Sequence, residues 1–335
     1  MNHSLNHSEN QVSRFGRRDF LRLGVLGAGT VVATSALPSF GKDNPSLFAN
    51  RGGVERLVLS YQHIHIGLKE PFSVLHISDT HLTAVNDGEF PELVAFAARR
   101  SQTFGGRQEE ALLDSLSWAR RNVDYVIHTG DLIDFQTEAN LDLVRKIFGE
   151  EKALACAMGN HEYQGRRAGE QIQNTTAYND RSTARLSSAY PFDISLQSNV
   201  VNGVNFVTMD QVYGFVTAKQ VARFKAEVAK GLPIILCMHV PFFTDHIWRA
   251  DQKYWRLRNQ KYRNAALPDP AGDYKRQLAD PVTRDFLAYL KGEPLLKGIL
   301  AGHLHITVQD RFSPTAMQYV VGGNFMFHGE EVLFT

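Results

Sequence analysis

The sequence predicts a layered α/β domain that follows a short N-terminal segment of different character. Short apolar runs typical of buried strands alternate along the chain with segments of helical periodicity. The chain has 335 residues, of which 43% are hydrophobic and 21% are charged, so it can bury a sizeable core. No internal repeat or low-complexity linker interrupts the pattern. This composition excludes disordered and fibrous proteins.

The predicted elements follow one another in a regular order. Strands are expected at 57–68, 72–78, 125–127, 154–158, 192–201, 204–209, 234–238, 298–301 and 318–321. Helices are expected at 109–121, 138–148, 217–230 and 282–290. Two local signals fix positions within this order. Asn202-Gly203 favours a tight hairpin turn between two strands, and Thr217-x-x-Gln220 resembles a capping box at the start of a helix.

Charge and cysteine content exclude two classes of protein. Lys and Arg number 36 against 35 Asp and Glu, and removal of residues 1–36 leaves a net charge of −1. Stable binding of nucleic acid through bulk charge is therefore not expected. The two cysteines, Cys156 and Cys237, lie in apolar runs and are predicted to be buried thiols. They exclude a disulfide-stabilised fold and are not metal-ligand candidates.

The N-terminal segment resembles an export signal. Arg17-Arg18 and the following Phe-Leu precede a Gly/Ala/Thr-rich apolar stretch at 23–37, an order similar to the bacterial twin-arginine signal. The stretch is shorter than the ~20 apolar residues of a spanning helix, so no transmembrane span is expected in the mature chain. The resemblance implies a signal at 1–36, a linker at 37–53, engagement of the twin-arginine machinery, and a periplasmic or extracellular location. An uncleaved anchor and a buried amphipathic helix are the alternatives.

Five polar clusters each follow a predicted strand directly. They are Asp79-Thr80-His81, Gly130-Asp131-Leu132-Ile133-Asp134, Gly159-Asn160-His161-Glu162, His239 and Gly302-His303-Leu304-His305. Strand ends at one edge of an α/β sheet bring distant loops together, so these residues are expected to share one cleft. Carboxylate, imidazole and amide ligands without thiolate suit Mn, Fe, Zn or a mixed pair. A histidine at one strand end is usually structural, but five clusters in this order indicate a metal centre.

The order D-x-H, G-D-x-x-D, G-N-H-[DE], H and G-H-x-H resembles the calcineurin-like metallophosphoesterases across residues 79–305. The resemblance implies an α/β/β/α fold over residues 54–335, in which two packed mixed sheets are flanked by helices. It also implies hydrolysis of phosphate esters with two divalent or mixed-valence metal ions. The expected ligands of the first metal are Asp79, His81, Asp131 and His305, and those of the second are Asp131, Asn160, His239 and His303.

The same resemblance assigns the chemistry. His161 is the expected catalytic acid, Glu162 is expected to orient it, and Asp134 fits a supporting partner better than a direct ligand. Two cations neutralise the phosphoryl oxygens and lower the pKa of a bridging water, and the resulting hydroxide attacks phosphorus in line. His161 then protonates the departing oxygen.

The subfamily pattern favours phosphodiesters as substrates. Asp134 stands where purple acid phosphatases have a tyrosine ligand, and Phe135 stands where Ser/Thr protein phosphatases have an arginine. A phosphomonoesterase on the same site is the alternative, and a non-catalytic metal-binding scaffold is a third hypothesis.

Substrate contacts are expected from the segments between the motifs. Residues 244–264 form a candidate cap in which Trp248, Trp255 and Tyr262 recur every seven residues, although packing of these aromatics on the domain is the alternative. The candidate substrate-binding cations are Arg166, Arg167, Arg249 and Arg256. The other strand histidines are interpreted as structural, namely His63, His65, His76 and His128.

Overall fold

The computed structural model describes residues 56–151, 154–165, 176–258 and 266–335. All of these fall within the second of two units of the chain, Thr34–Thr335. The predicted signal at 1–36 and the linker at 37–53 lie outside the described residues. A search of the described helices finds none with the length and apolarity needed to cross a membrane.

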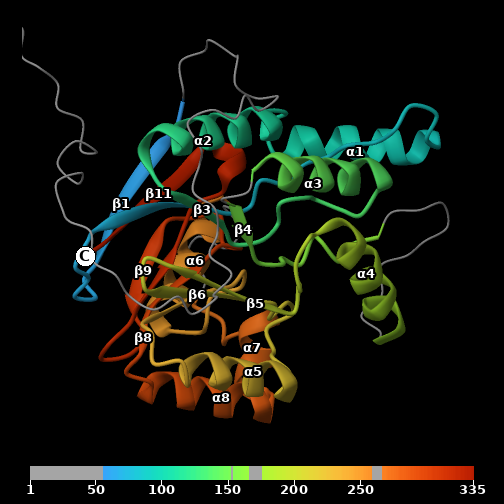
Figure 1. The fold of residues 1–335 in the computed structure, drawn as a ribbon. Helices are drawn as coiled ribbons and strands as arrows, with labels where there is room; N and C mark the ends of the chain where they lie inside the picture. Colours follow the sequence, from blue (N-terminus) through green and yellow to red (C-terminus); the bar gives the residue numbers. More distant parts are fainter. Residues whose placement is uncertain (1–55, 152–153, 166–175, 259–265) are drawn as a thin grey trace, which may run out of the picture. The chain divides into compact units, whose positions relative to one another are not determined.

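The first sheet has five strands in the order β1-β11-β2-β3-β4. The strands are β1 (Val58–Ile64), β2 (Phe72–Ile77), β3 (Tyr125–His128), β4 (Leu154–Cys156) and β11 (His328–Phe334). β11 runs parallel to β1 and antiparallel to β2, while β2, β3 and β4 are mutually parallel. The last strand of the chain therefore lies inside the sheet, between two strands from its beginning (Figure 1).

The second sheet has six strands in the order β5-β6-β7-β8-β10-β9. The strands are β5 (Leu196–Val201), β6 (Val204–Met209), β7 (Ile234–Cys237), β8 (Leu296–Ala301), β9 (Val308–Arg311) and β10 (Met317–Val320). β6, β7, β8 and β10 are parallel, and both edge strands are antiparallel to their neighbours. The β5–β6 hairpin turns at Asn202-Gly203, where both residues have the positive φ that the sequence signal predicts.

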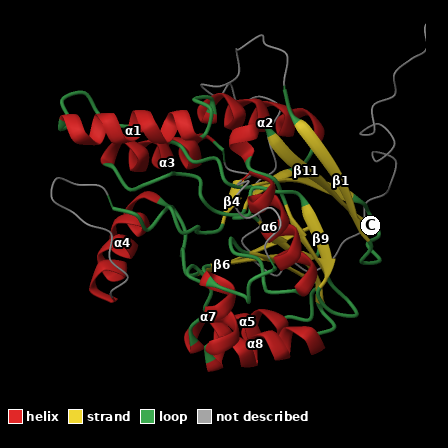
Figure 2. Cartoon of the chain, turned by 180° about the vertical axis from the view of Figure 1, so that it is seen from behind, coloured by secondary structure: helices red, strands yellow, loops and turns green. Residues whose placement is uncertain are grey.

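Helices cover the outer face of each sheet, which gives four layers (Figure 2). The described helices are α1 (Pro91–Thr103), α2 (Gln108–Asn122), α3 (Glu138–Glu150), α4 (Thr176–Ala189), α5 (Ala218–Val228), α6 (Asp245–Arg258), α7 (Gly272–Ala279), α8 (Pro281–Gly292) and the 3₁₀ turn η3 (Asn324–Met326). One apolar core lies between the sheets, where Val74 and Ile127 pack with Phe206 and Leu300. A second core joins α2, α3 and α4 to the first sheet, and a third joins α5 and α8 to the second. The predicted α/β/β/α fold with two packed mixed sheets is confirmed.

The capping box of α5 provides a test of local stability. Thr217 Oγ1 accepts a hydrogen bond from the Gln220 N–H at 3.2 Å, and Gln220 Oε1 accepts one from the Thr217 N–H at 2.8 Å. Thr217→Ala is therefore expected to lower the free energy of unfolding by about 1 kcal/mol in urea denaturation. Thr217→Ser keeps the hydroxyl acceptor and is the matched control. An equal loss of unfolding free energy in Thr217→Ala and Thr217→Ser would contradict the capping role of the Thr217 hydroxyl.

Candidate active site

The five predicted clusters converge at one edge of the two sheets. β2, β3 and β4 end at this edge in the first sheet, and β7 and β8 end there in the second. Several predicted ligands adopt the left-handed backbone region, which non-glycine residues occupy only when their surroundings hold them there. They are Asp79 (φ 57°), His81 (55°), Asp131 (55°), His303 (71°) and His305 (56°). The backbone thus turns sharply at these residues.

Backbone contacts between the loops hold this geometry. The Asp79 N–H donates to the Gly130 carbonyl and the His81 N–H donates to the Asp131 carbonyl, both at 2.9 Å. A Cβ atom at Gly159 would lie 2.2 Å from Asp131 Oδ1, so only glycine permits this approach. Gly159 in the third cluster is therefore required for the close packing of that loop against Asp131 in the second cluster.

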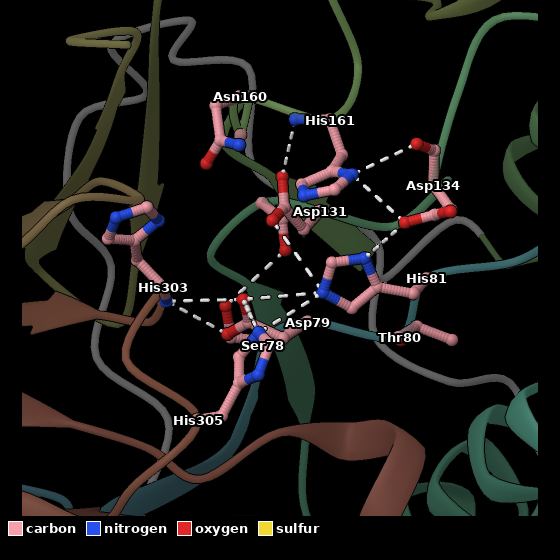
Figure 3. A network of polar contacts seen from close by, with 12 residues as sticks. Ser78, Asp79, Thr80, His81, Asp131, Asp134, Asn160, His161, His303 and His305 are labelled. Carbon is pink, nitrogen blue, oxygen red and sulfur yellow. Dashed lines mark hydrogen bonds and ion pairs between the residues drawn. The ribbon is translucent and has the colours of Figure 1, made fainter. Parts of the chain in front are cut away.

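Asp79, His81 and His305 form one group of side chains around the carboxylate of Asp79 (Figure 3). Asp79 Oδ1 lies 3.3 Å from His305 Nε2 and 3.9 Å from His81 Nε2, and the two imidazole Nε2 atoms are 3.2 Å apart. Asp79 is fully buried, which opposes its ionisation. The charges of His305 and His239 outweigh burial and hold the pKa of Asp79 below its usual range.

A second group gathers around Asp131 and contains His239 and His303. His239 Nε2 lies 3.2 Å from Asp131 Oδ2, from His303 Nδ1 and from the amide oxygen of Asn160. Asp131 Oδ2 also lies 3.7 Å from His81 Nε2, in the first group. Asp131 therefore joins the two groups, as a shared ligand must.

The chemistry of this donor set fits divalent metal ions. Within each group the donor atoms lie within 4.8 Å of one another, and they are carboxylate oxygens and imidazole nitrogens that converge on a common point. Outward nitrogens of the same rings are already engaged: His239 Nδ1 is 2.8 Å from the Thr129 carbonyl oxygen, and His81 Nδ1 is 3.0 Å from Asp134 Oδ1. These contacts leave the Nε2 atoms of both rings directed into the site.

His161 lies at the opening of the site, with 19% of its side chain exposed. Its Nδ1 is 2.9 Å from Asp134 Oδ1, and its backbone N–H donates to Asp131 Oδ1 at 2.8 Å (Figure 3). Burial lowers the pKa of His161, but Asp131 and Asp134 outweigh it and raise the pKa to about 9. Both carboxylates therefore favour the protonated imidazole, which suits a proton donor.

Sequence reasoning missed Arg100, which comes from α1. Its Nε donates to Asp134 Oδ2 at 2.6 Å and its Nη2 donates to Asp134 Oδ1 at 2.7 Å. This two-point contact fixes the carboxylate that holds both His81 and His161. Asp273 of α7 was missed as well, and its Oδ2 lies 3.7 Å from His303 Nε2. No local motif marks either residue, because each lies in a helix and not in a polar cluster that follows an apolar strand run.

Glu162 has a different structural task from the one expected. Its buried carboxylate accepts hydrogen bonds from the backbone N–H groups of Asp131, Leu132, Ile133 and Gly159, at 2.7–3.2 Å. It thus holds the loop after β3 against the loop after β4. In the described structure it is Asp134 that contacts the His161 ring, so Asp134 rather than Glu162 orients that side chain.

The other predicted substrate contacts are only partly described. Arg166, Arg167 and Tyr262 lie outside the described residues. Within α6, exposed Arg249 lies 3.8 Å from Asp245, and Arg256 donates to the Ala266 carbonyl at 2.5 Å. The predicted aromatic face is divided: Trp248 is buried in an apolar cluster, whereas Trp255 is 48% exposed.

The strand histidines have ordinary hydrogen-bond partners. Buried His76 lies between Glu330 and Thr129, and His128 Nε2 is 2.9 Å from Thr80 Oγ1. His63 and His65 both contact the Thr335 hydroxyl at the surface. Their interpretation as structural residues agrees with these contacts.

Asp210, at the end of β6, provides a pH test outside the predicted ligands. Burial raises its pKa to about 6, although the Tyr163 hydroxyl donates to its Oδ2 at 2.5 Å. The raised pKa means that the folded state favours the neutral carboxyl. The stability that this group contributes is present below about pH 4 and is lost as the pH rises towards 6. The free energy of unfolding of the wild type should therefore fall across this window relative to Asp210→Asn, by on the order of 1–3 kcal/mol. If the free energy of unfolding changed with pH in the same way for the wild type and for Asp210→Asn, that result would contradict the raised pKa of Asp210.

Comparison with known proteins gives a family. The family model for calcineurin-like phosphoesterases matches residues 72–307. Among solved structures, the chain is similar to a dimetal phosphatase from Danio rerio at 15% identity and a TM-score of 0.43, covering 76% of this chain and 88% of that one. It is also similar to phosphopantetheinyl hydrolase from Mycobacterium tuberculosis, at 13% identity and a TM-score of 0.39, covering 75% and 90%. A putative 5′-nucleotidase from Staphylococcus aureus shares 13% identity with a TM-score of 0.38, and the match covers 76% of this chain and 49% of that one. A comparison with curated proteins found no match.

The fold and the family model together define a metal-dependent hydrolase of phosphoric esters. The match extends over well more than half of the sequence and contains all five clusters. The chain belongs to the calcineurin-like phosphoesterase family.

Proposed function

We propose that this enzyme hydrolyses phosphodiesters in preference to phosphomonoesters. The observation that carries the preference is Phe135, which is fully buried at the position where a phosphate-binding arginine would follow the second motif. A diester carries one negative charge fewer than a monoester dianion, so it needs less cationic compensation. Arg100, which contacts this motif, is already paired with Asp134.

The residues of the site have distinct proposed roles. Two divalent ions, held by the two groups that share Asp131, would supply charge neutralisation at the phosphoryl group and a water of lowered pKa. Asp134 holds His161 through Nδ1, so the other ring nitrogen can give its proton to the departing alkoxide oxygen. Arg100 fixes the Asp134 carboxylate, and Glu162 holds the loop after β3 against the loop after β4. Mn, Fe and Zn are the candidate metals.

Export and the substrate cap belong to the same proposal. The twin-arginine pattern at Arg17-Arg18 supports passage of a folded, metal-loaded enzyme to the periplasm or beyond. The exposed cations Arg249, Lys253 and Arg258 of α6 support a cap at residues 244–264 that attracts anionic esters. Alanine variants of Arg166, Arg167, Arg249 and Arg256 test the contacts, because loss of a substrate contact raises KM. Fusion of residues 1–36 to a reporter tests the signal, and retention of the fusion in the cytoplasm would contradict it.

The deciding experiment compares two chromogenic esters that share one leaving group. The manganese-loaded enzyme is assayed on bis-(p-nitrophenyl) phosphate and p-nitrophenyl phosphate. A higher kcat/KM on the diester supports the proposal, and the reverse order supports the phosphomonoesterase alternative. Absence of turnover on both esters by protein that carries two metals would favour the non-catalytic scaffold.

A further inference from the structure

A cavity of about 230 Å³ lies beside the predicted metal centre and has no part in the chemistry assigned so far. Its wall is formed mainly by the residues after β6, together with Tyr163, Thr183 of α4 and the two residues before β5. Residues that characterise it are Tyr163, Ser195, Asp210, Tyr213, Phe215 and Gln220. Its volume is below the roughly 300–1,000 Å³ of pockets for drug-sized ligands, so it suits a single ring or a short head group.

The cavity is tied to the predicted metal centre by direct contacts. Tyr163 comes two residues after His161, and its hydroxyl donates to Asp210 Oδ2 at 2.5 Å. Next to Asp210, the Gln211 side chain donates to the carbonyl of Val240, which follows His239. The cavity therefore lies at the same edge of the sheets as the site, next to the group that contains Asn160 and His239.

A third contact joins the other wall of the cavity to the site. The Tyr213 carbonyl accepts a hydrogen bond from Arg276 Nε at 2.5 Å, and Arg276 also pairs with Asp273. Asp273 in turn lies 3.7 Å from His303 Nε2. Two walls of the cavity are thus fixed relative to the predicted ligands.

The lining residues indicate what the cavity accepts. The described residues that line it include one carboxylate, Asp210, and three aromatic rings, but no lysine, arginine or histidine. An anionic group would therefore be repelled. Gln220 already donates to the Ser195 and Asp210 carbonyls, whereas the Asp210 carboxylate retains acceptor capacity beside its bonds to Tyr163 and Val212. Phe215, 40% exposed, offers an apolar surface at the rim.

We infer that this cavity binds the alcohol portion of the substrate, and that it selects a group presenting an N–H donor to Asp210 and an apolar face to Phe215. This inference rests on the proposed function, because the alcohol is the part of an ester that lies next to the phosphate. A heteroaromatic base and an alkylammonium head group both carry this chemistry. The cavity thus determines which esters are accepted, while the metal-binding groups act on the phosphate common to all of them.

Direct binding to the intact chain tests the inference without relying on turnover. Isothermal titration calorimetry compares two matched pairs of phosphate-free probes: adenosine with purine riboside, which lacks the amino group, and ethanolamine with propan-1-ol. In one of the pairs the donor-bearing probe is expected to bind about tenfold more tightly than its partner. The adenosine pair identifies a base site, and the ethanolamine pair identifies a head-group site.

Variants localise the binding. Asp210→Asn removes the negative charge and replaces one acceptor oxygen by an amide donor, so it is expected to reduce the preference within the pair. Phe215→Ala is expected to weaken both members of the pair. Phe215 is exposed at the rim, so that variant remains informative even if Asp210→Asn fails to fold. Tyr61→Ala removes another exposed aromatic, on β1, and is the matched control. Equal binding within both pairs, absence of binding, or binding that is unchanged in Phe215→Ala would overturn the inference. Binding as expected in a chain that hydrolyses no ester would instead refute the proposed function, and it would leave the cavity as a binding site for the probe but not for the alcohol of a substrate.

Discussion

Asp131→Asn is expected to remove metal binding and turnover together. Asp131 Oδ2 lies 3.2 Å from His239 Nε2 and 3.7 Å from His81 Nε2, so both groups of side chains depend on one oxygen. The substitution keeps the shape of the side chain but replaces an anionic ligand by a neutral amide. We expect kcat/KM to fall at least about a thousandfold, equivalent to about 4 kcal/mol. Metal content by mass spectrometry should fall below two ions per chain in the same sample.

The control for this variant is Asp142→Asn on α3. Asp142 is 66% exposed and pairs only with Arg145 among the contacts described. Its substitution should therefore change neither kcat/KM nor the metal content. Wild-type turnover by Asp131→Asn protein would refute the shared-ligand role. Loss of turnover with both metals retained would show that Asp131 acts on the substrate rather than on the ions.

His161→Ala is expected to spare metal content and slow turnover. His161 contacts Asp134 through Nδ1 and is not among the predicted ligands, so the donor groups around Asp79 and Asp131 stay complete. Removal of a general acid reduces kcat by roughly 10²–10⁴. The loss should be larger for an alkyl ester than for a nitrophenyl ester, because the nitrophenolate leaves without protonation. Steady-state kinetics on both substrates measures this difference.

His63→Ala is the matched control, since His63 is a surface imidazole that contacts Thr335. An equal loss on alkyl and nitrophenyl esters would show that His161 stabilises charge on phosphorus rather than donating a proton. Unchanged kinetics on both would remove His161 from the mechanism.

The strands that precede the polar clusters were predictable, because in each case an apolar run is followed directly in the sequence by a polar cluster. The run at 125–127 followed by Gly130-Asp131 is an example, and β3 is buried along its whole length. β11 was missed because Glu330 and Glu331 make the segment look polar. Glu330 is nevertheless buried, since it pairs with His76 of β2. Only the tertiary structure supplies that partner.

Helix α1 was missed for a different reason. Phe90 precedes it and provides no side-chain cap, so only Pro91 and Glu92 mark the start of the helix in the sequence. The contact between Arg100 and Asp134 could not be predicted either, because two residues that are 34 positions apart in the sequence form no local pattern. Residues at strand ends were therefore predictable, whereas the side chains that brace them from helices were not.

The position of β11 constrains when the first sheet can form. Among the described strands, β1 pairs with β11 alone, so Val58 meets His328 near the other end of the chain. β1 therefore lacks this strand partner until residues 328–334 have been synthesised. Pairing across so long a separation is slow, because the loop-closure entropy must be overcome first. The first sheet is thus completed only when residues 328–334 are available to pair. Under the proposed export by the twin-arginine pathway, the folded domain can be transported only after β11 has joined the first sheet.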